Sequence, residues 1–165
     1  MNDEILKVIE KVHRLLTERK LTISVAESCT GGLISHYLTT LAGASAFFEA
    51  AVVSYSVESK EKILKVSPDL ISSCGVVSIE VAKEMAKKVR LLTQTDYAIS
   101  TTGNLGPDVL EGKEKGLVYI AIDTKEQTFA RKLILKGDRE SNKREAALQS
   151  LEFVIEAIEN DKKDD

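Results

Sequence analysis

Tryptophan is absent from this sequence, and aromatic residues make up only 5% of it. A packed core must therefore be built mainly from Val, Ile, Leu and Ala. The hydrophobic fraction of 43% is enough for such a core, and 165 residues suit one domain of ordinary size. No repeat, linker or change in composition divides the chain. We therefore expect a single domain over residues 1–160, followed by a charged tail over residues 161–165.

Blocks of basic residues are absent as well. Lys and Arg total 23 against 26 Asp and Glu, which gives a formal net charge of -3. Because strong nucleic-acid binding usually needs a concentrated positive patch, this balance disfavours DNA or RNA as a partner. Histidine is also scarce, with only His13 and His36 in the chain. That scarcity argues against a Ser-His-Asp triad and against a zinc site.

Long apolar runs and a secretory leader are missing from the printed sequence. No apolar stretch approaches the roughly 20 residues that a bilayer-spanning helix needs. The acidic start, Met1 to Glu4, lacks the positive charge and apolar run of a signal peptide. The two cysteines, Cys29 and Cys74, are too few for a disulfide framework. These absences predict a protein of the reducing cytoplasm that has no membrane partner.

Helix and strand patterns alternate along most of the chain. The expected strands cover residues 21–26, 50–54, 97–101, 117–123 and 129–135. The expected helices begin near Asp3, which we take as a cap, and near Leu33, Ser56, Ser67, Ser78 and Arg139. The helix after Ser78 is expected to bury Val81, Met85, Val89 and Leu92. The alternation predicts an α/β fold in layers, and the late hairpin makes the sheet mixed. Residues 102–115 are left as a loop whose length suggests function or mobility.

A turn of small and hydroxyl-bearing residues follows the first expected strand, and reads Glu27-Ser28-Cys29-Thr30-Gly31-Gly32. Ligands of open α/β sheets gather at the carboxyl ends of strands, and the free N–H groups of a helix start favour an anion. A hydroxyl there could attack a carbonyl carbon while N–H groups hold the oxyanion. The alternative is structural, with Ser28 or Thr30 as a helix cap and the glycines as turn formers. The segment matches neither G-x-S-x-G nor the phosphate loop.

The segment Ala26 to Gly32 resembles the opening motif of the CinA C-terminal domain family. The resemblance covers about residues 5–157 and continues through Gly43-Ala44-Ser45-Ala46-Phe47-Phe48, Tyr55-Ser56-Val57-Glu58-Ser59-Lys60, Gly75-Val76-Val77-Ser78, Gly116-Leu117-Val118-Tyr119-Ile120-Ala121 and Gly137-Asp138-Arg139. Stand-alone members of the family are amidases that convert nicotinamide mononucleotide to nicotinate mononucleotide and ammonia. The resemblance implies a three-layer α/β/α sandwich with a mixed sheet and commonly a homodimer. It also implies a small-molecule nucleotide substrate and no metal or organic cofactor.

The same resemblance implies roles for particular residues. Ser28 is the nucleophile, Lys60 its base, Tyr55 a supporting hydroxyl and Arg139 a further site residue. We expect the substrate to be bound by Glu27, Cys29, Thr30, Gly31, Gly32, Thr102, Gly103 and Arg139. Lysine can act as a base only if its pKa falls well below about 10.4. A tyrosine hydroxyl between Ser28 and Lys60 could relay the proton or fix the hydrogen bonds.

Each role has an alternative in the residues themselves. Tyr55 can be a packed aromatic at a strand end, and Lys60 can be a solvated lysine on a charged helix. Cys29 is a rival nucleophile, because a helix start can lower the pKa of a thiol. A cysteine hydrolase normally needs a histidine, however, and both histidines lie in the middle of expected helices, where we expect a surface position.

The start of the last expected helix suits a phosphate. Its N-terminal dipole favours an anion, and Arg139 can add a bidentate grip that lysine cannot copy. The alternative is that Asp138 caps the helix and Arg139 is solvated.

Two positions depart from the family pattern. Val57 stands where the family usually has Asn after the Tyr-Ser pair. The loop Gly103-Asn104-Leu105-Gly106-Pro107-Asp108-Val109-Leu110 has lost the usual glycine-rich continuation, and we expect Val109 and Leu110 to stiffen it. These changes leave two further hypotheses open: a nucleotide-binding module that has lost catalysis, and an amidase for a different small amide.

Overall fold

The computed structural model describes residues 1–161. Five strands form one sheet in the order β2-β1-β3-β4-β5. They are β1 (Ile23–Glu27), β2 (Phe48–Val53), β3 (Tyr97–Gly103), β4 (Leu117–Thr124) and β5 (Thr128–Ile134). β1 runs parallel to β2 and β3, whereas β3 pairs with β4, and β4 with β5, in antiparallel fashion. The sheet is therefore mixed, as the expected hairpin predicted.

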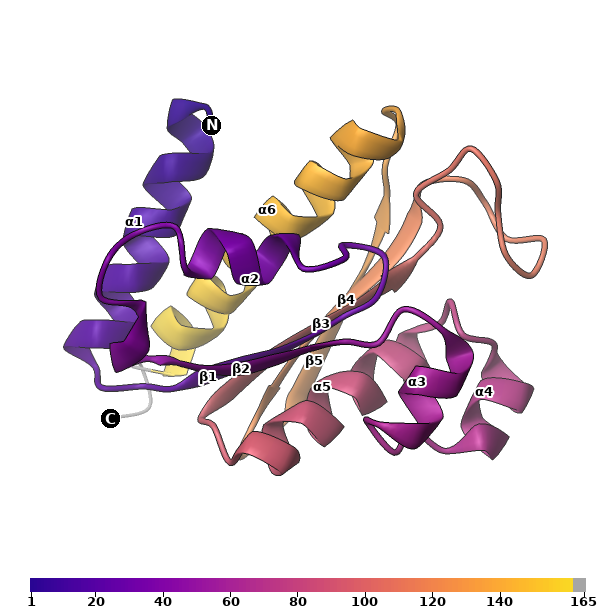
Figure 1. Ribbon diagram of the computed structural model, residues 1–165, viewed down its shortest axis with the longest axis horizontal. Coiled ribbons are helices and arrows are strands. Elements are labelled where there is room, and N and C mark those ends of the chain that lie inside the picture. The colour runs from indigo at the N-terminus through magenta and orange to yellow at the C-terminus, as the bar shows by residue number, and fades with distance from the viewer. Residues whose placement is uncertain (162–165) are drawn as a thin grey trace.

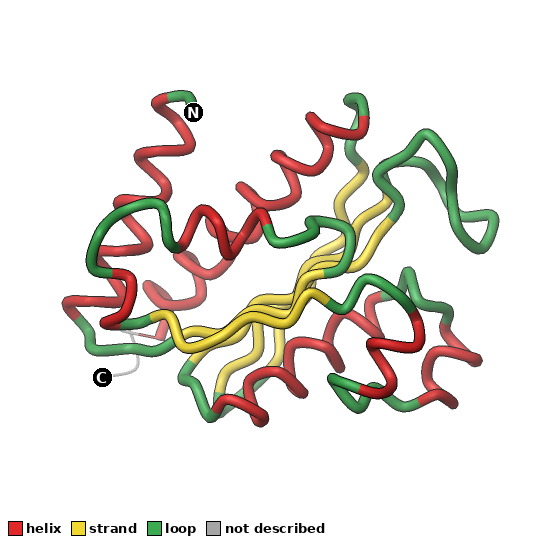
Figure 2. Tube along the Cα trace, viewed as in Figure 1, coloured by secondary structure: helices red, strands yellow, loops and turns green. Residues whose placement is uncertain are grey.

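Helices cover both faces of this sheet (Figure 1). One face carries α1 (Asp3–Glu18), α2 (Leu33–Leu38) and α6 (Arg139–Asp161), and the other carries α3 (Val57–Lys62), α4 (Pro68–Cys74) and α5 (Ile79–Thr93). The short 3-10 helix η1 (Ala44–Ala46) precedes β2. Figure 2 shows the strands as the middle layer between two layers of helices. The predicted three-layer α/β/α sandwich is thereby confirmed.

The last helix is longer than predicted. We expected it to end at Ile158, but α6 continues to Asp161, the first residue of the expected tail. The rest of that tail, residues 162–165, lies outside the described residues. Among residues 1–161, no helix combines the length and apolar character needed to cross a membrane.

The sheet separates an aliphatic core into two parts. On one side the buried stripe of α1 packs against residues of the sheet, α2 and α6. This stripe consists of Ile5, Ile9, Val12, Leu15 and Leu16. On the other side Val81, Met85 and Val89 of α5 pack against Ala26 and Ala98. Leu92 was expected to share this stripe but is 62% exposed. Its neighbour Leu91 is 61% exposed, so these two side chains near the end of α5 do not pack against the core.

Side-chain caps fix the starts of the helices. Asn2 accepts a hydrogen bond from the N–H of Ile5 at 2.9 Å, so Asn2 rather than the predicted Asp3 caps α1. Ser56, Ser67 and Ser78 cap α3, α4 and α5 in the same way, as expected. The cap of α3 matters most for the site, since it sets where the residues of that helix point.

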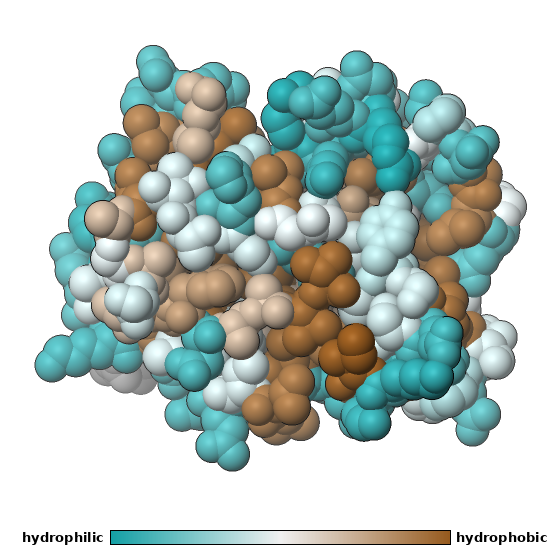
Figure 3. Space-filling model, in the orientation of Figure 1, coloured by the Kyte–Doolittle hydropathy of each residue, from teal (hydrophilic) through white to brown (hydrophobic). Residues whose placement is uncertain are grey.

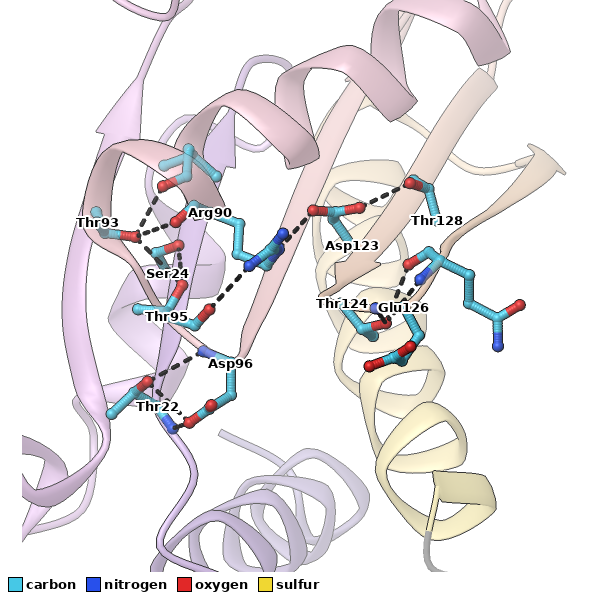
Figure 4. Close-up of polar contacts among 12 residues, drawn as sticks. Thr22, Ser24, Arg90, Thr93, Thr95, Asp96, Asp123, Thr124, Glu126 and Thr128 are labelled. Carbon is cyan, nitrogen blue, oxygen red and sulfur yellow. Dashed lines mark hydrogen bonds and ion pairs between the residues drawn. The ribbon is translucent and has the colours of Figure 1, made fainter. Parts of the chain in front are cut away.

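A polar network holds the end of the sheet where β1 and β3 begin (Figure 4). The N–H of Thr22 donates to the Asp96 carboxylate at 2.9 Å, and the N–H of Asp96 donates to the Thr22 hydroxyl at 3.1 Å. Arg90 of α5 pairs with Asp123 of β4 at 2.6 Å. Because these groups satisfy one another, internal hydrogen bonds and an ion pair hold this end of the sheet.

Apolar side chains gather in the middle of the face shown in Figure 3, where Figure 1 places β2 and the start of α3. Val53 ends β2 and is 47% exposed, and Val57 begins α3 and is 43% exposed. β2 is an edge of the sheet, and Glu49 is its only charged residue. The other edge, β5, carries exposed Arg131 and Lys132, the charges that commonly protect a sheet edge from pairing. The β2 edge is therefore the less protected of the two.

Candidate active site

The hydroxyl of Ser28 and the amine of Lys60 are in direct contact. Lys60 Nζ lies 2.7 Å from Ser28 Oγ, although 32 residues separate them in the chain. Ser28 is 7% exposed and Lys60 is 1% exposed. The parallel pairing of β1 and β2 explains the contact, because β1 ends immediately before Ser28 at the same edge where β2 leads into α3. The structure thus brings together the two residues that the family resemblance pairs.

Two backbone carbonyls hold the amine of Lys60. Its Nζ lies 2.7 Å from the oxygen of Ser54 and 3.2 Å from that of Tyr55. A neutral amine has two N–H donors and one lone pair. When both donors bond the carbonyls, the lone pair faces the Ser28 hydroxyl and can accept its proton. Burial lowers the pKa of Lys60 to about 8, so this neutral form is accessible near physiological pH.

The Tyr55 hydroxyl lies elsewhere than predicted. The direct contact of Ser28 and Lys60 leaves no place for a group between them. Tyr55 is 59% exposed, and its hydroxyl accepts a hydrogen bond from Arg139 Nη2 at 2.9 Å. The predicted position of the tyrosine hydroxyl is therefore wrong, and Tyr55 touches Lys60 only through its backbone.

Arg139, the first residue of α6, bridges two parts of the site. Its Nη1 donates to the carbonyl of Gly106 at 2.7 Å, and its Nη2 donates to the Tyr55 hydroxyl. Both acceptors are uncharged, and within residues 1–161 no carboxylate pairs with this guanidinium. Asp138 accepts the N–H of Ser141 at 2.8 Å and caps α6. The predicted anion site at the start of this helix is thus already filled by a carboxylate, while the Arg139 side chain keeps an uncompensated charge.

Glu27 is bound inside the protein. It is fully buried, and its carboxylate accepts bonds from the Thr30 hydroxyl at 2.7 Å, the N–H of Ile34 at 2.9 Å and the N–H of Ser35 at 3.0 Å. The Ser35 hydroxyl donates to it as well, at 2.6 Å. These bonds satisfy the first N–H groups of α2, which otherwise lack partners. We therefore reassign the side chains of Glu27 and Thr30 from substrate contact to the support of the turn.

Thr101 of β3 supports the same turn, a role that was not predicted from the sequence. Its backbone oxygen accepts the N–H of Ser28 at 3.2 Å, and its hydroxyl lies 2.9 Å from that of Thr30. Thr102, predicted to bind the substrate, is 1% exposed and donates to the carbonyl of Val76 at 2.8 Å. Neighbouring residues of a strand face opposite sides of the sheet, so only one of the two threonines reaches the turn. Thr102 is therefore buried on the side of the sheet away from the turn, because β3 continues to Gly103 and includes residues expected in the loop.

The backbone after Ser28 can hold an oxyanion. Within residues 1–161 the N–H groups of Cys29 and Thr30 have no hydrogen-bond acceptor on another residue, and they immediately follow Ser28. Gly31 and Gly32 adopt φ values of +57° and +103°, which favour glycine. These backbone conformations let the chain turn from β1 into α2 while its N–H groups remain near Ser28.

Cys29 is a poor nucleophile in this environment. Burial raises the pKa of its thiol to about 12, so almost no thiolate is present at neutral pH. His13 is half-buried rather than on the surface, since its ring bonds the carbonyl of Leu38 and packs edge-on against Phe47. Neither histidine lines the pocket beside Ser28. Within the described residues, no three His, Cys, Asp or Glu side chains group to hold a metal ion.

A pocket of about 220 Å³ opens beside Ser28. Its lining consists of Ser28, Cys29, Tyr55, Gly103, Asn104, Leu105, Asp108, Val109, Leu110 and Arg139. Five of the predicted site residues therefore share one pocket. Gly103 is required by packing, because a Cβ there would lie 2.7 Å from the carbonyl oxygen of Leu117.

The loop of residues 104–116 forms one wall of the pocket. The Asn104 side chain closes the loop on itself, accepting the N–H of Leu110 at 3.0 Å. Glu111 accepts the N–H groups of Val76 and Val77, each at 3.0 Å, and ties the loop to the segment before α5. These side-chain bonds restrain the loop, whereas the sequence predicted stiffness from its apolar residues.

Replacing Glu27 with Ala should lower the free energy of unfolding by about 2–4 kcal/mol, because the buried donors of α2 lose their acceptor. Urea unfolding measures this change. Glu27→Gln, which keeps one acceptor oxygen, should lose less. If Glu27→Ala instead kept wild-type stability and raised the Michaelis constant, Glu27 would be a substrate-binding residue, as the sequence predicted.

The family model described as the CinA C-terminal domain matches residues 5–158. This chain belongs to the CinA C-terminal domain family. The competence damage-inducible protein A (ComA) from Klebsiella pneumoniae has a similar structure, with a TM-score of 0.90 and 30% identity over 94% of this chain and 96% of that one. The competence/damage inducible protein CihA from Agrobacterium tumefaciens has a TM-score of 0.91 and 28% identity over 96% and 98% of the two chains.

Curated relatives include proteins much longer than this chain. A putative competence-damage inducible protein of Thermoanaerobacter sp. (strain X514) is 46% identical over 146 residues, which are 88% of this chain and 35% of that protein. The protein of the same description from Listeria monocytogenes serovar 1/2a is 42% identical over 151 residues, covering 91% and 36%. The chain therefore spans about a third of the length of these CinA relatives.

Proposed function

We propose that this CinA-family chain is an amidase that hydrolyses the carboxamide of nicotinamide mononucleotide to the carboxylate and ammonia. The observation that carries the proposal is the buried 2.7 Å contact of Lys60 Nζ with Ser28 Oγ. A lysine whose pKa is lowered to about 8 beside a serine hydroxyl has the features of a base and its nucleophile.

The proposed reaction proceeds through an acyl-enzyme. Lys60 takes the proton of Ser28, and the serine oxygen attacks the carboxamide carbon. The N–H groups of Cys29 and Thr30 stabilise the oxyanion of the tetrahedral intermediate. The Lys60 ammonium then protonates the leaving nitrogen, so that ammonia departs and an ester on Ser28 remains. A water molecule, deprotonated by Lys60, hydrolyses that ester and restores the Ser28 hydroxyl.

The substrate class rests on the family resemblance and on the pocket. Arg139 offers a cation without a carboxylate partner in the described chain, which suits the phosphate of a mononucleotide. Tyr55 offers an exposed aromatic ring beside it. A carboxamide placed at Ser28 would leave the rest of the nucleotide to extend along these two side chains.

The direct test is to incubate the purified protein with nicotinamide mononucleotide and measure released ammonia. Release in equal amounts with nicotinate mononucleotide supports the proposal. Absence of ammonia contradicts it, and a thermal-shift screen of nucleotides then separates a binding module from an amidase for another amide.

A second candidate is an amidase for a different small amide. The pocket wall favours it, because Val109 and Leu110 line the pocket and are 42% and 56% exposed. Apolar side chains there would suit a less polar substrate than a nucleotide. Ammonia release from a panel of aromatic amides without phosphate distinguishes the two candidates.

Replacing Arg139 with Ala should raise the Michaelis constant for nicotinamide mononucleotide about 10- to 150-fold, the effect of losing a charge-assisted hydrogen bond. The phosphate-free nucleoside should be a poor substrate of the wild type. The substitution should raise the Michaelis constant for this nucleoside far less than that for the nucleotide. Steady-state kinetics with both substrates measures this. An equal loss of kcat/KM with both substrates would show instead that Arg139 acts at the catalytic centre or stabilises the fold.

The homodimer stays a prediction, which sedimentation equilibrium would test. The edge of β2, with its exposed Val53 and single charge at Glu49, is the surface that we propose a second copy would cover. A monomeric mass at all accessible concentrations would contradict it.

A further inference from the structure

Lys143 is a second cation beside the catalytic turn, and the proposed mechanism does not use it. It lies in α6, one helical turn after Arg139, and is half-buried. A Cβ built on Gly31 would lie only 3.3 Å from Lys143 Nζ. The ammonium group therefore packs against the turn that follows Ser28, in space that the missing side chain of Gly31 leaves open.

Two carboxylates of α6 that lie close to Lys143 in the chain are engaged elsewhere. Glu140 accepts a bond from Arg144 at 3.3 Å, and Glu145 accepts one from Gln149 at 2.8 Å. Within the described part of the chain, Lys143 itself makes no ion pair and no hydrogen bond. Its neighbour Arg144 is thus neutralised on the helix surface, while the charge of Lys143 is left uncompensated.

Residues four apart on a helix lie on the same face, so Lys143 and Arg139 present two cations together. Arg139 reaches Tyr55 and Gly106 on one side, and Lys143 reaches Gly31 on the other. Two cations without carboxylate partners repel each other, and a dianion bound between them would remove that repulsion. A phosphate monoester is an anion of this charge.

We propose that Lys143 binds the phosphate group of the substrate together with Arg139. This inference rests on the proposed function, because it assigns the phosphate of the same substrate. Arg139 supplies a planar donor fork and Lys143 a point charge, so the two together enclose the phosphate oxygens from two directions. Lys143 is a binding residue and takes no part in the proton transfers at Ser28.

The experiment compares Lys143→Ala with Arg144→Ala, a matched loss of charge at the next position of the same helix. Lys143→Ala should raise the Michaelis constant for nicotinamide mononucleotide about 10- to 100-fold and leave kcat nearly unchanged. Neither kinetic constant should change for the phosphate-free nucleoside. Arg144→Ala should behave as wild type with both substrates, and Lys143→Arg should restore most of the affinity. An unchanged Michaelis constant in Lys143→Ala, or equal damage with nucleotide and nucleoside, would overturn the inference.

A second readout separates this inference from the proposed function. If the wild type releases no ammonia from the nucleotide, the proposed function fails, but the anion site can still be measured. Inorganic phosphate in a phosphate-free buffer should then raise the melting temperature of the wild type and of Arg144→Ala, and should not raise that of Lys143→Ala. Equal shifts in all three proteins, or no shift in the wild type, would overturn the assignment of Lys143.

Discussion

Ser28→Ala should abolish ammonia release, with a loss of about a thousandfold or more in kcat, because no other nucleophile contacts Lys60. The hydroxyl bonds Lys60 and nothing else among the described side chains, so its removal should change the free energy of unfolding by only about 0.5–2 kcal/mol. Steady-state ammonia release measures the first effect, and urea unfolding the second. Thermal shift should show that the variant still binds the nucleotide.

Cys29→Ala is the matched control, since it removes the rival nucleophile from the adjacent position. Burial raises the pKa of that thiol to about 12, so we expect Cys29→Ala to keep most of the activity. Wild-type turnover in Ser28→Ala, together with loss of turnover in Cys29→Ala, would show that the nucleophile is the thiol.

Lys60→Arg should be nearly inactive, with a loss of about a thousandfold or more in kcat. Arginine keeps the positive charge but stays protonated at every accessible pH, so it cannot take the proton of Ser28. The wild-type protein should also show a rise in kcat/KM with pH. Lys60 is mostly charged below its pKa of about 8 and mostly neutral above it, so activity should increase through pH 8 and then level off.

Lys62→Arg on the same short helix is the control for this substitution. Lys62 is exposed and pairs with Glu58, so the change should leave both the rate and the pH profile as they are. If Lys60→Arg retained near-normal turnover, Lys60 would supply only charge. A flat pH profile between pH 6 and about 9 would contradict its role as the base in the same way.

Local patterns predicted the architecture well, because hydrophobic periodicity reports which face of an element is buried. The stripe of α1 and the caps Ser56, Ser67 and Ser78 follow directly from residue type and spacing. Leu92 shows the limit of that reasoning. Periodicity places it on the buried face of α5, but it cannot show that the helix ends where no neighbour covers it.

The site was predictable only in part. Pairing Ser28 with Lys60 came from the family resemblance, since nothing in a lysine-rich helix marks one lysine as buried. The structural roles of Glu27 and Thr101 could not be predicted from the sequence, because they depend on which side of a strand faces the turn. The Tyr55 hydroxyl was misplaced for a similar reason, since its direction depends on an arginine that is 84 residues away.

The burial of Lys60 also couples folding to the release of a proton. The pKa of this amine is about 8 in the folded protein, against about 10.4 for an exposed lysine in the unfolded chain. Between these values the unfolded state binds more protons, so the free energy of unfolding should rise with pH from about 8 to about 10.4, by up to about 3 kcal/mol. Below pH 8 that stabilisation is missing, and the rest of the fold must offset the cost of burying a charge.

Urea unfolding of the wild type and of Lys60→Met across this pH range tests the coupling. The free energy of unfolding should rise with pH in the wild type and should not rise in Lys60→Met; parallel curves would mean that folding leaves this amine unperturbed. At neutral pH the protein is thus less stable than it would be without this buried charge, and the amine of Lys60 is the cause.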